Sequence, residues 1–408
     1  MGGRRTPDEG AGADGGEERA LPFPRAEYDR RLAETRGRME EAGLDALVVT
    51  DPANMNYLTG YDAWSFYVPQ AVVVTPGDDP TWVGRKMDAG AARATTWLDA
   101  DHVRAYTDEH VQSSRDVHPM DFVASVMSDL GAGGGRVGVE MDAHYYTARS
   151  DRRLRDGLPG ASFADATLLV NRVRLRKSER EIRYMEQAGR LADEGMRRGM
   201  EAVAPGVPES EVAAEIYRGL VGGTEDHGGD YPAIVPLLPA GLRSTTPHLT
   251  WSDRRYREGD PVIVELAGVR HRYHAPLART AFVGEPPAEV AEAYAVLHRA
   301  QQAAVAAATV GAPCEEVDAA ARGIIAEAGW GDRFIHRTGH GIGVEEHEDP
   351  YIVEGNRTPL APGHAFSIEP GIYVPGRFGM RLEDIVVAAE GGPEPLNRAD
   401  HALAVVGG

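Results

Sequence analysis

Two apolar runs separated by a short polar turn, between Val262 and Thr280, constrain the fold of this chain more than any other segment. The residues read V-I-V-E-L-A-G-V-R-H-R-Y-H-A-P-L-A-R-T, which predicts a strand, a turn and a second strand. A single carboxylate, Glu265, lies inside the first run with hydrophobic neighbours on both sides. A carboxylate in such surroundings needs a cation or hydrogen-bond donors as partners, so Glu265 is a candidate site residue.

Histidines and carboxylates in four other segments are candidates to join Glu265. They lie in T-P-H-L, G-H-G-I-G-V-E-E-H-E, S-I-E-P-G and R-L-E-D, in this order along the chain. Carboxylates that converge on one site repel one another and raise one another's pKa unless a cation lies among them. The full candidate set is His248, Glu265, His340, His347, Glu369 and Glu383.

The order of these segments resembles the pita-bread family, which includes aminopeptidase P, prolidase, methionine aminopeptidase and the non-peptidase creatinase. In its metallopeptidases, an Asp on a strand, a second Asp just before T-R-T, a His in G-H-G-I-G and two Glu residues hold two divalent metals. Glu265 and Pro276 stand at the two Asp positions here. The three later ligand positions and the two substrate-side histidines match the family: His340, Glu369 and Glu383, with His248 and His347.

Pro276 is the most informative departure from the family pattern. Proline has no side-chain donor atom, so the bridging ligand is missing, and Glu in place of Asp at position 265 lengthens that arm by one methylene. A two-metal hydrolase holds its ions about 3.5–4 Å apart under shared ligands. We therefore expect no metal and no other cofactor; a single ion on the three retained ligand positions is the alternative. Creatinase is the family's precedent for metal-free chemistry.

The electrostatics of the candidate set favour a small cationic substrate. A planar amidinium or guanidinium would neutralise converging glutamates by donating paired N–H bonds to them. A finer resemblance narrows the substrate, because the segments 54–70 and 246–251 are similar to the ectoine hydrolases of this family. That resemblance implies a hydrolase that opens the cyclic amidine of ectoine to N-acetyl-2,4-diaminobutyrate, and it implies a downstream deacetylase as a functional partner.

Roles for the catalytic candidates follow from the resemblance and from the chemistry. Glu265 is expected to face the amidinium carbon, where it either attacks as a nucleophile or activates water as a general base; the sequence leaves both open. His340 and His248 are candidates for proton transfer. Glu369 and Glu383 are expected to hold the ring nitrogens.

Substrate contacts are expected from both halves of the chain. His347 is the candidate that orients the substrate, and Trp64 and Tyr67 are candidates to cover a flat cation with their rings. In the resembling family the small N-terminal domain, often from a partner subunit, leans over the mouth of the catalytic site. The resemblance therefore implies a homodimer.

Three other functions compete with this hypothesis. Two are enzymatic: a creatinase-type amidinohydrolase and a metal-dependent Xaa-Pro peptidase. The third, of another class, is a catalytically inactive pita-bread module that only binds a partner. The retained histidines and glutamates favour an enzyme over the inactive module.

Composition excludes several partner classes. The formal net charge of −20 argues against nucleic acid, whose binding needs a basic surface. No run of about 18 apolar residues is present, so no membrane span is expected. Arg4 and Arg5 are followed by no apolar segment of an export signal, which predicts a cytoplasmic protein. The single cysteine, Cys314, excludes an internal disulfide.

The hydrophobic pattern predicts an α/β protein of two domains. Helix-period segments at 26–42 and 120–130 alternate with apolar runs at 44–50, 71–75 and 136–140, as in a largely covered sheet. Ser178 followed by Glu181 is a capping box that predicts the start of a long helix. Further amphipathic helices are expected over 288–309 and 314–328.

The predicted domain boundaries follow from this pattern and from the resemblance. Residues 1–20 are predicted to be a disordered tail, because they are rich in Gly, Ala and Glu. A creatinase-like α/β domain is expected over 21–175. An α+β pita-bread catalytic domain is expected over 176–408.

Overall fold

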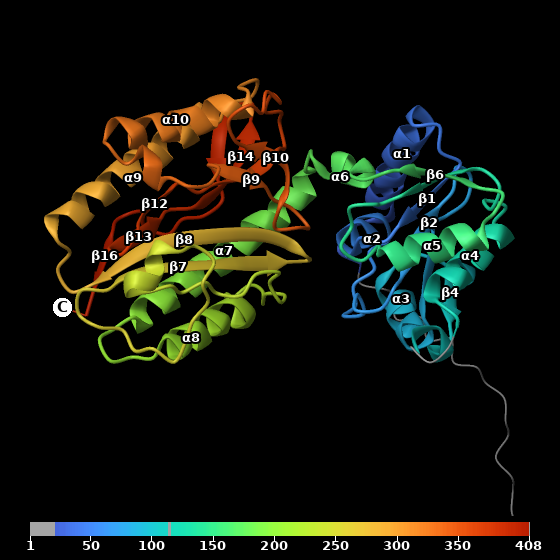
Figure 1. The fold of residues 1–408 in the computed structure, drawn as a ribbon, viewed down its shortest axis with the longest axis horizontal. Coiled ribbons are helices and arrows are strands. Elements are labelled where there is room, and N and C mark those ends of the chain that lie inside the picture. The colour runs from blue at the N-terminus through green and yellow to red at the C-terminus, as the bar shows by residue number, and fades with distance from the viewer. Residues whose placement is uncertain (1–20, 113–115, 408) are drawn as a thin grey trace, which may run out of the picture. The chain divides into compact units, whose positions relative to one another are not determined.

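The computed structural model describes residues 21–112 and 116–407. They divide into two compact units, one ending at Thr167 and the other beginning at Leu168, which Figure 1 colours by residue number. The predicted disordered tail lies outside the described residues. The division falls a few residues before the predicted boundary, ahead of the short helix α6 (Leu169–Arg174).

The first unit is built on a six-stranded mixed sheet in the order β4-β3-β2-β1-β5-β6. The two pairs that contain β2 are antiparallel and the other three are parallel. The strands are β1 (Ala46–Val49), β2 (Ala71–Val74), β3 (Thr81–Arg85), β4 (Val103–Tyr106), β5 (Arg136–Val139) and β6 (Ser162–Asp165). The helices are α1 (Arg25–Glu41), α2 (Pro52–Thr59), α3 (Ala89–Thr95), α4 (Pro119–Asp129) and α5 (Ala148–Gly157). The predicted α/β alternation of this unit is confirmed.

Apolar runs explain why this sheet forms. All four residues of β1 and all four of β2 are buried, as expected for strands covered on both faces. Val48, Val73 and Val139 pack with Met120 and Leu154 of α4 and α5 in one core. The covering helices therefore supply the burial that the uninterrupted valine runs require.

The β7–β8 hairpin is the backbone of the second unit. β7 (Pro261–Arg270) and β8 (Tyr273–Val283) pair in unbroken antiparallel register along their whole length. Successive strand residues point to opposite faces, so the hairpin contributes to two cores. Val262, Val264 and Leu266 pack with helices α7 (Glu179–Ala202) and α8 (Glu209–Gly222). The predicted capping box at Ser178 is present at the start of α7.

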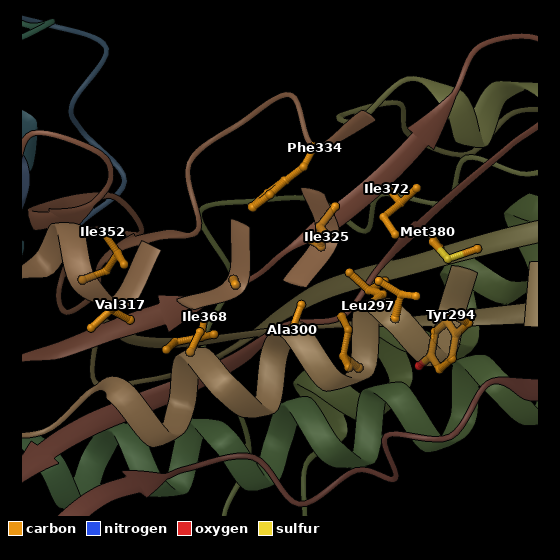
Figure 2. Close-up of a cluster of buried hydrophobic side chains, with 14 of the residues drawn as sticks. Tyr294, Leu297, Ala300, Val317, Ile325, Phe334, Ile352, Ile368, Ile372 and Met380 are labelled. Carbon is orange, nitrogen blue, oxygen red and sulfur yellow. The ribbon is translucent and has the colours of Figure 1, made fainter. Parts of the chain in front are cut away.

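The opposite face of the hairpin turns towards a second helix pair, α9 (Ala288–Ala307) and α10 (Cys314–Glu327). Figure 2 shows this core, in which Leu297 and Ala300 of α9 lie beside Ile368 and Met380. Cys314 is buried in the same core, as a small apolar residue. Figure 1 shows the hairpin between the two helix pairs.

Short strands complete the second unit in a five-stranded sheet, β10-β9-β11-β14-β15, a pair, β12–β13, and a strand beside the hairpin, β16-β8-β7. Their bounds are β9 (Gly339–Gly341), β10 (Glu348–Ile352), β11 (Ala365–Ile368), β12 (Gly371–Val374), β13 (Phe378–Arg381), β14 (Asp384–Ala389), β15 (Gly392–Pro395) and β16 (Ala404–Val406). His340 lies in strand β9. None of the described helices is long and apolar enough to cross a membrane.

Candidate active site

The register of the hairpin places Glu265 and Pro276 on one face. Glu265 lies opposite Ala278, and Pro276 lies opposite Ala267 on the adjoining pair of that face. The opposite face of the hairpin, which carries Val262, Val264 and Leu266, packs in the α7–α8 core. The predicted neighbourhood of the two family ligand positions is therefore retained, although proline fills one of them.

Arg381, at the end of β13, is the cationic partner of Glu265. Its Nη1 donates a hydrogen bond to Oε2 of Glu265, and the same nitrogen lies 3.8 Å from Oε2 of Glu369. Burial acts to lower the pKa of Arg381, but the charges of Glu265 and its other neighbours outweigh burial and raise it well above its ordinary value. The sequence predicted that Glu265 needs a cation, but it did not identify Arg381.

A chain of hydrogen bonds through Tyr373 and His336 holds the Nε side of the Arg381 guanidinium. Its Nε donates to the hydroxyl of Tyr373 at 2.9 Å, and that hydroxyl lies 3.1 Å from Nε2 of His336. Nδ1 of His336 lies 2.8 Å from the carbonyl of Arg337, which fixes the neutral tautomer with its proton on Nδ1. Burial, followed by the charge of Arg381, lowers the pKa of His336 to about 4, so the ring stays neutral at physiological pH.

The imidazole of His340 is paired with the carboxyl group of Glu369. Nε2 of His340 lies 3.1 Å from Oε1 of Glu369, and Nδ1 lies 3.0 Å from the carbonyl of Gly341. Ser367 donates to the same Glu369 oxygen at 3.2 Å. The flanking glycines are required by packing, since a Cβ on Gly339 would come within 1.9 Å of the Ser367 carbonyl. Burial acts to raise the pKa of Glu369, but His340 and Arg381 outweigh it and lower this pKa.

Two further glutamates lie close to this pair without a cation of their own. Glu383 is almost fully buried, and its Oε2 has no hydrogen-bond partner among the described residues. Burial and the charges of Glu369 and Glu265 raise the pKa of Glu383 well above its ordinary value. The pKa of Glu346, in the loop between β9 and β10, is raised by burial and by the same two charges. Each therefore keeps its proton to a higher pH than an ordinary glutamate.

We call Glu265, Glu346, Glu369 and Glu383, with Arg381 among them, the acidic cluster. Two substrate-side histidines lie beside it. The ring of His347 stacks on His340 at 3.8 Å between centroids. His347 is exposed overall, but partial burial of its ring and the nearby His340 lower its pKa to about 4. His248 is exposed on a backbone with a φ of 68°, and its charge contributes to the lowered pKa of His347.

The donor set does not match a two-metal centre. Pro276 has no donor atom, and Glu265 is already engaged by Arg381. Within the ranges that the structure describes, no group of three or more His, Cys, Asp or Glu side chains is arranged to hold a metal ion, and the three retained ligand positions form no such group. The residues therefore lack the shared clamp of a two-metal hydrolase.

The two aromatic candidates lie in the first unit. Trp64 and Tyr67 are 67% and 54% exposed, and their rings contact each other with centroids 5.5 Å apart. Phe66 and Tyr145 extend the contact into a small aromatic surface. Exposure excludes a core role for Trp64 within its unit, and its role towards substrate stays a prediction.

Sequence reasoning brought the main candidates together but missed four residues of the site. The missed residues are Arg381, Tyr373, His336 and Glu346. A signal existed for Arg381, which lies two positions before Glu383 in R-L-E-D. Glu346 could have been noticed because it directly precedes His347. Tyr373 and His336 carry no pattern that distinguishes them from structural residues.

Comparisons with known proteins identify the family of this chain. Two family models match the chain: Metallopeptidase family M24 over residues 183–390, and the Creatinase/Prolidase N-terminal domain over residues 31–176. Ectoine hydrolase of Halomonas elongata is 40% identical over 92% of this chain and 96% of its own. The crystal structure of dipeptidase PepE from Mycobacterium ulcerans has a TM-score of 0.79 at 36% identity, covering 95% of this chain and 100% of that chain. A prolidase structure from Thermococcus sibiricus has a TM-score of 0.83 at 28% identity, covering 93% and 99%.

Proposed function

Because the chain belongs to metallopeptidase family M24, whose members are hydrolases, we propose that it opens the cyclic amidine ring of ectoine to N-acetyl-2,4-diaminobutyrate. The similarity to an ectoine hydrolase supports the substrate. The composition of the acidic cluster supports the binding of a small delocalised cation.

The observation that carries this proposal is the excess of carboxyl groups over cations beside a proline. Among the described residues Arg381 pairs with Glu265 and Glu369, whereas no cation pairs with Glu346 or Glu383, and the bridging ligand position is Pro276. An amidinium would supply the missing positive charge and could donate paired N–H bonds to carboxylates. Binding of such a cation would lower the pKa of Glu383, because the raised pKa comes partly from neighbouring negative charges.

The proposed reaction adds one water across a ring C–N bond. A C–O bond forms at the amidine carbon, the bond to one ring nitrogen breaks, and that nitrogen receives a proton. Oε2 of Glu265 is held by Arg381, whereas Oε1 accepts no hydrogen bond from the described residues. Oε1 is therefore the atom that attacks the carbon or deprotonates the attacking water. His340, which faces Glu369, and the protonated Glu383 are the candidates that supply the proton.

The remaining candidates would bind and orient the substrate. Glu369 and Glu383 would hold the ring nitrogens, and His347 and His248 would face the substrate from the exposed side. Tyr373 and Arg381 would keep Glu265 in place. Trp64 and Tyr67 would cover the flat ring in a homodimer. A cytoplasmic location and a downstream deacetylase belong to the same proposal.

A peptidase is the second candidate function, because prolidase and dipeptidase structures share the whole fold. Incubation of purified protein with ectoine, creatine and a Gly-Pro dipeptide separates the three enzymatic functions. We expect a product 18 mass units heavier than ectoine, which corresponds to one added water, and no change in the other two compounds. Cleavage of Gly-Pro without ectoine turnover would overturn the proposal.

The inactive binding module is tested by ligand-induced stabilisation. Ectoine at 100 times its Kd should stabilise a binding protein by about 2.7 kcal/mol. A rise in melting temperature together with turnover supports the enzyme. The absence of both effects would favour the inactive module.

A further inference from the structure

The loop of residues 342–347, between β9 and β10, carries His347 and Glu346 to the acidic cluster. His347 stacks on His340, which places its ring beside the reacting groups, and Glu346 directly precedes it in the chain. The position of the loop is set by contacts at three points, which are Gly343, Glu345 and, directly after the loop, Glu348.

The first anchor is at Gly343, near the start of the loop. The backbone N–H of His274 donates to the Gly343 carbonyl at 2.9 Å, and Nδ1 of the same residue donates to it at 3.2 Å. Nε2 of His274 accepts from the N–H of Ala233 at 3.3 Å. Burial lowers the pKa of His274 to about 4, so this histidine is a neutral structural residue with both nitrogens satisfied.

The second and third anchors are ion pairs to the segment that begins the second unit. Nη2 of Arg174, on α6, donates to Oε2 of Glu345 at 2.6 Å and also to Oε1 of Glu348. Nζ of Lys177 donates to Oε2 of Glu348 at 3.0 Å. Asn171 donates to the same Glu345 oxygen at 3.2 Å. Glu345 and Glu348 lie on either side of Glu346 and His347, so the two site residues are held from both directions.

The charged groups that hold the loop are themselves buried. Arg174, Lys177 and Glu348 are 1%, 6% and 5% exposed. Oε1 of Glu348 also accepts the backbone N–H of Glu345 at 3.0 Å, which closes the turn on itself. A Cβ at Gly343 would lie 2.7 Å from Oε1 of Glu348 and 2.9 Å from Cε of Lys177, so these two side chains pack directly against the backbone of the loop. Burial acts to raise the pKa of Glu348, but the two cations outweigh it and lower the pKa to about 2.

We propose that Arg174 is a positioning residue: through its ion pairs with Glu345 and Glu348 it sets the 342–347 loop, and thereby the position of His347 against His340. Arg174 touches none of the reacting groups in this account. The inference rests on the proposed function for its kinetic consequences and on the described contacts for its structural ones.

The kinetic test compares Arg174→Lys with Arg176→Lys, an exposed arginine of the same segment. Lysine keeps the charge, but its flexible ammonium lacks the fixed planar geometry in which Nη2 of Arg174 donates to both carboxylates. A misplacement of about 1 Å in an active site can cost 10²-fold, so kcat/KM for ectoine should fall about 10- to 100-fold in Arg174→Lys. Arg176→Lys should match the wild type. An equal loss in both variants, or no loss in either, would overturn the inference.

A double-variant cycle distinguishes positioning from a general loss of stability. If Arg174 acts through the loop, the loss caused by Arg174→Lys should be several-fold smaller in a His347→Ala background, because the residue it positions is already gone. An undiminished loss in that background would show that Arg174 does not act through the loop. If Arg174→Lys fails to fold, Glu345→Gln removes one ion pair from the partly buried side and should give a several-fold loss.

A readout without substrate separates this inference from the proposed function. Hydrogen–deuterium exchange of the backbone amides of 342–347 should be faster in Arg174→Lys than in the wild type, while α9 stays protected to the same degree. Unchanged exchange in the loop would overturn the inference. A wild type that does not open ectoine would instead overturn the proposed function, and the exchange result would still decide whether Arg174 holds the loop.

Discussion

The 342–347 loop lies between two groups of buried carboxylates that differ in how their charges are balanced. In the balanced cluster, Arg174 and Lys177 face Glu345 and Glu348, so two cations meet two carboxylates. In the acidic cluster, Arg381 pairs with Glu265 and Glu369, and among the described residues no cation pairs with Glu346 or Glu383. The pKa of Glu348 is lowered to about 2, whereas burial and like charges raise the pKa of Glu383.

This difference separates carboxylates that hold the structure from carboxylates that are available to a ligand. A buried carboxylate whose oxygens already accept hydrogen bonds or ion pairs has no free acceptor for a ligand. Removal of its cationic partner mainly lowers the stability of the fold. A buried carboxyl group that lacks a partner destabilises the folded protein and gains most from a cation. We therefore infer that the acidic cluster is the substrate site and that the balanced cluster supports it.

The largest expected effect is on activity when Glu265 loses its charge. Glu265→Gln keeps the shape of the side chain but removes the nucleophile or base, so kcat/KM for ectoine should fall roughly a thousandfold or more while the fold persists. Circular dichroism and melting temperature provide the folding control. A Glu265→Gln enzyme with the wild-type rate would show that the residue is structural and that the proposed mechanism is wrong.

The two clusters should respond to charge removal with opposite signs of stability change. Lys177→Met leaves Glu348 with one cation fewer and should lower the free energy of unfolding by about 3–5 kcal/mol. Glu383→Gln removes an unpartnered carboxyl group and should raise the free energy of unfolding at pH 7. Urea denaturation of both variants measures the two changes. Changes of the same sign would mean that the clusters are not electrostatically different.

The pH dependence of stability should also differ between the clusters. The stabilisation from Glu348, whose pKa is lowered, is present above its unfolded value of 4.5 and is lost as the pH falls towards 2. The contribution of Glu383, whose pKa is raised, is present below 4.5 and is lost as the pH rises through its folded pKa. Stability relative to Glu383→Gln should therefore decrease between pH 5 and pH 8. A constant difference over that range would contradict the raised pKa.

The smallest expected effect concerns the aromatic surface of the first unit. Trp64→Ala should raise KM for ectoine while the protein stays folded, because a stacked cation contact is worth about 0.5–2 kcal/mol. This corresponds to a few-fold to roughly thirtyfold loss of binding. Since Trp64 is 67% exposed, a change in melting temperature is not expected. An unchanged KM would show that Trp64 does not contribute to substrate binding.

The sequence predicted those features that depend on local pattern. The two apolar runs on either side of a polar turn predicted the hairpin, and the Ser178 capping box marked the start of α7. The need of Glu265 for a cation was also predictable, because burial of a lone carboxylate is costly.

Features that depend on contacts between distant residues could not be predicted in this way. Arg174 and Glu348 are 174 positions apart, and no local pattern marks them as partners. The hydrogen bonds from Arg381 through Tyr373 to His336 likewise depend on the tertiary fold.

Turnover of ectoine by metal-stripped enzyme tests the central claim most directly. The protein is treated exhaustively with a strong chelator, bound metal is measured, and formation of N-acetyl-2,4-diaminobutyrate is followed before and after addition of manganese, zinc or cobalt. We predict that the rate is unchanged by chelation and by each added metal, because Glu265, Arg381 and their neighbours form a site without the bridging ligand. Activity that is lost on chelation and restored by a metal would contradict this account and favour a metal-dependent peptidase.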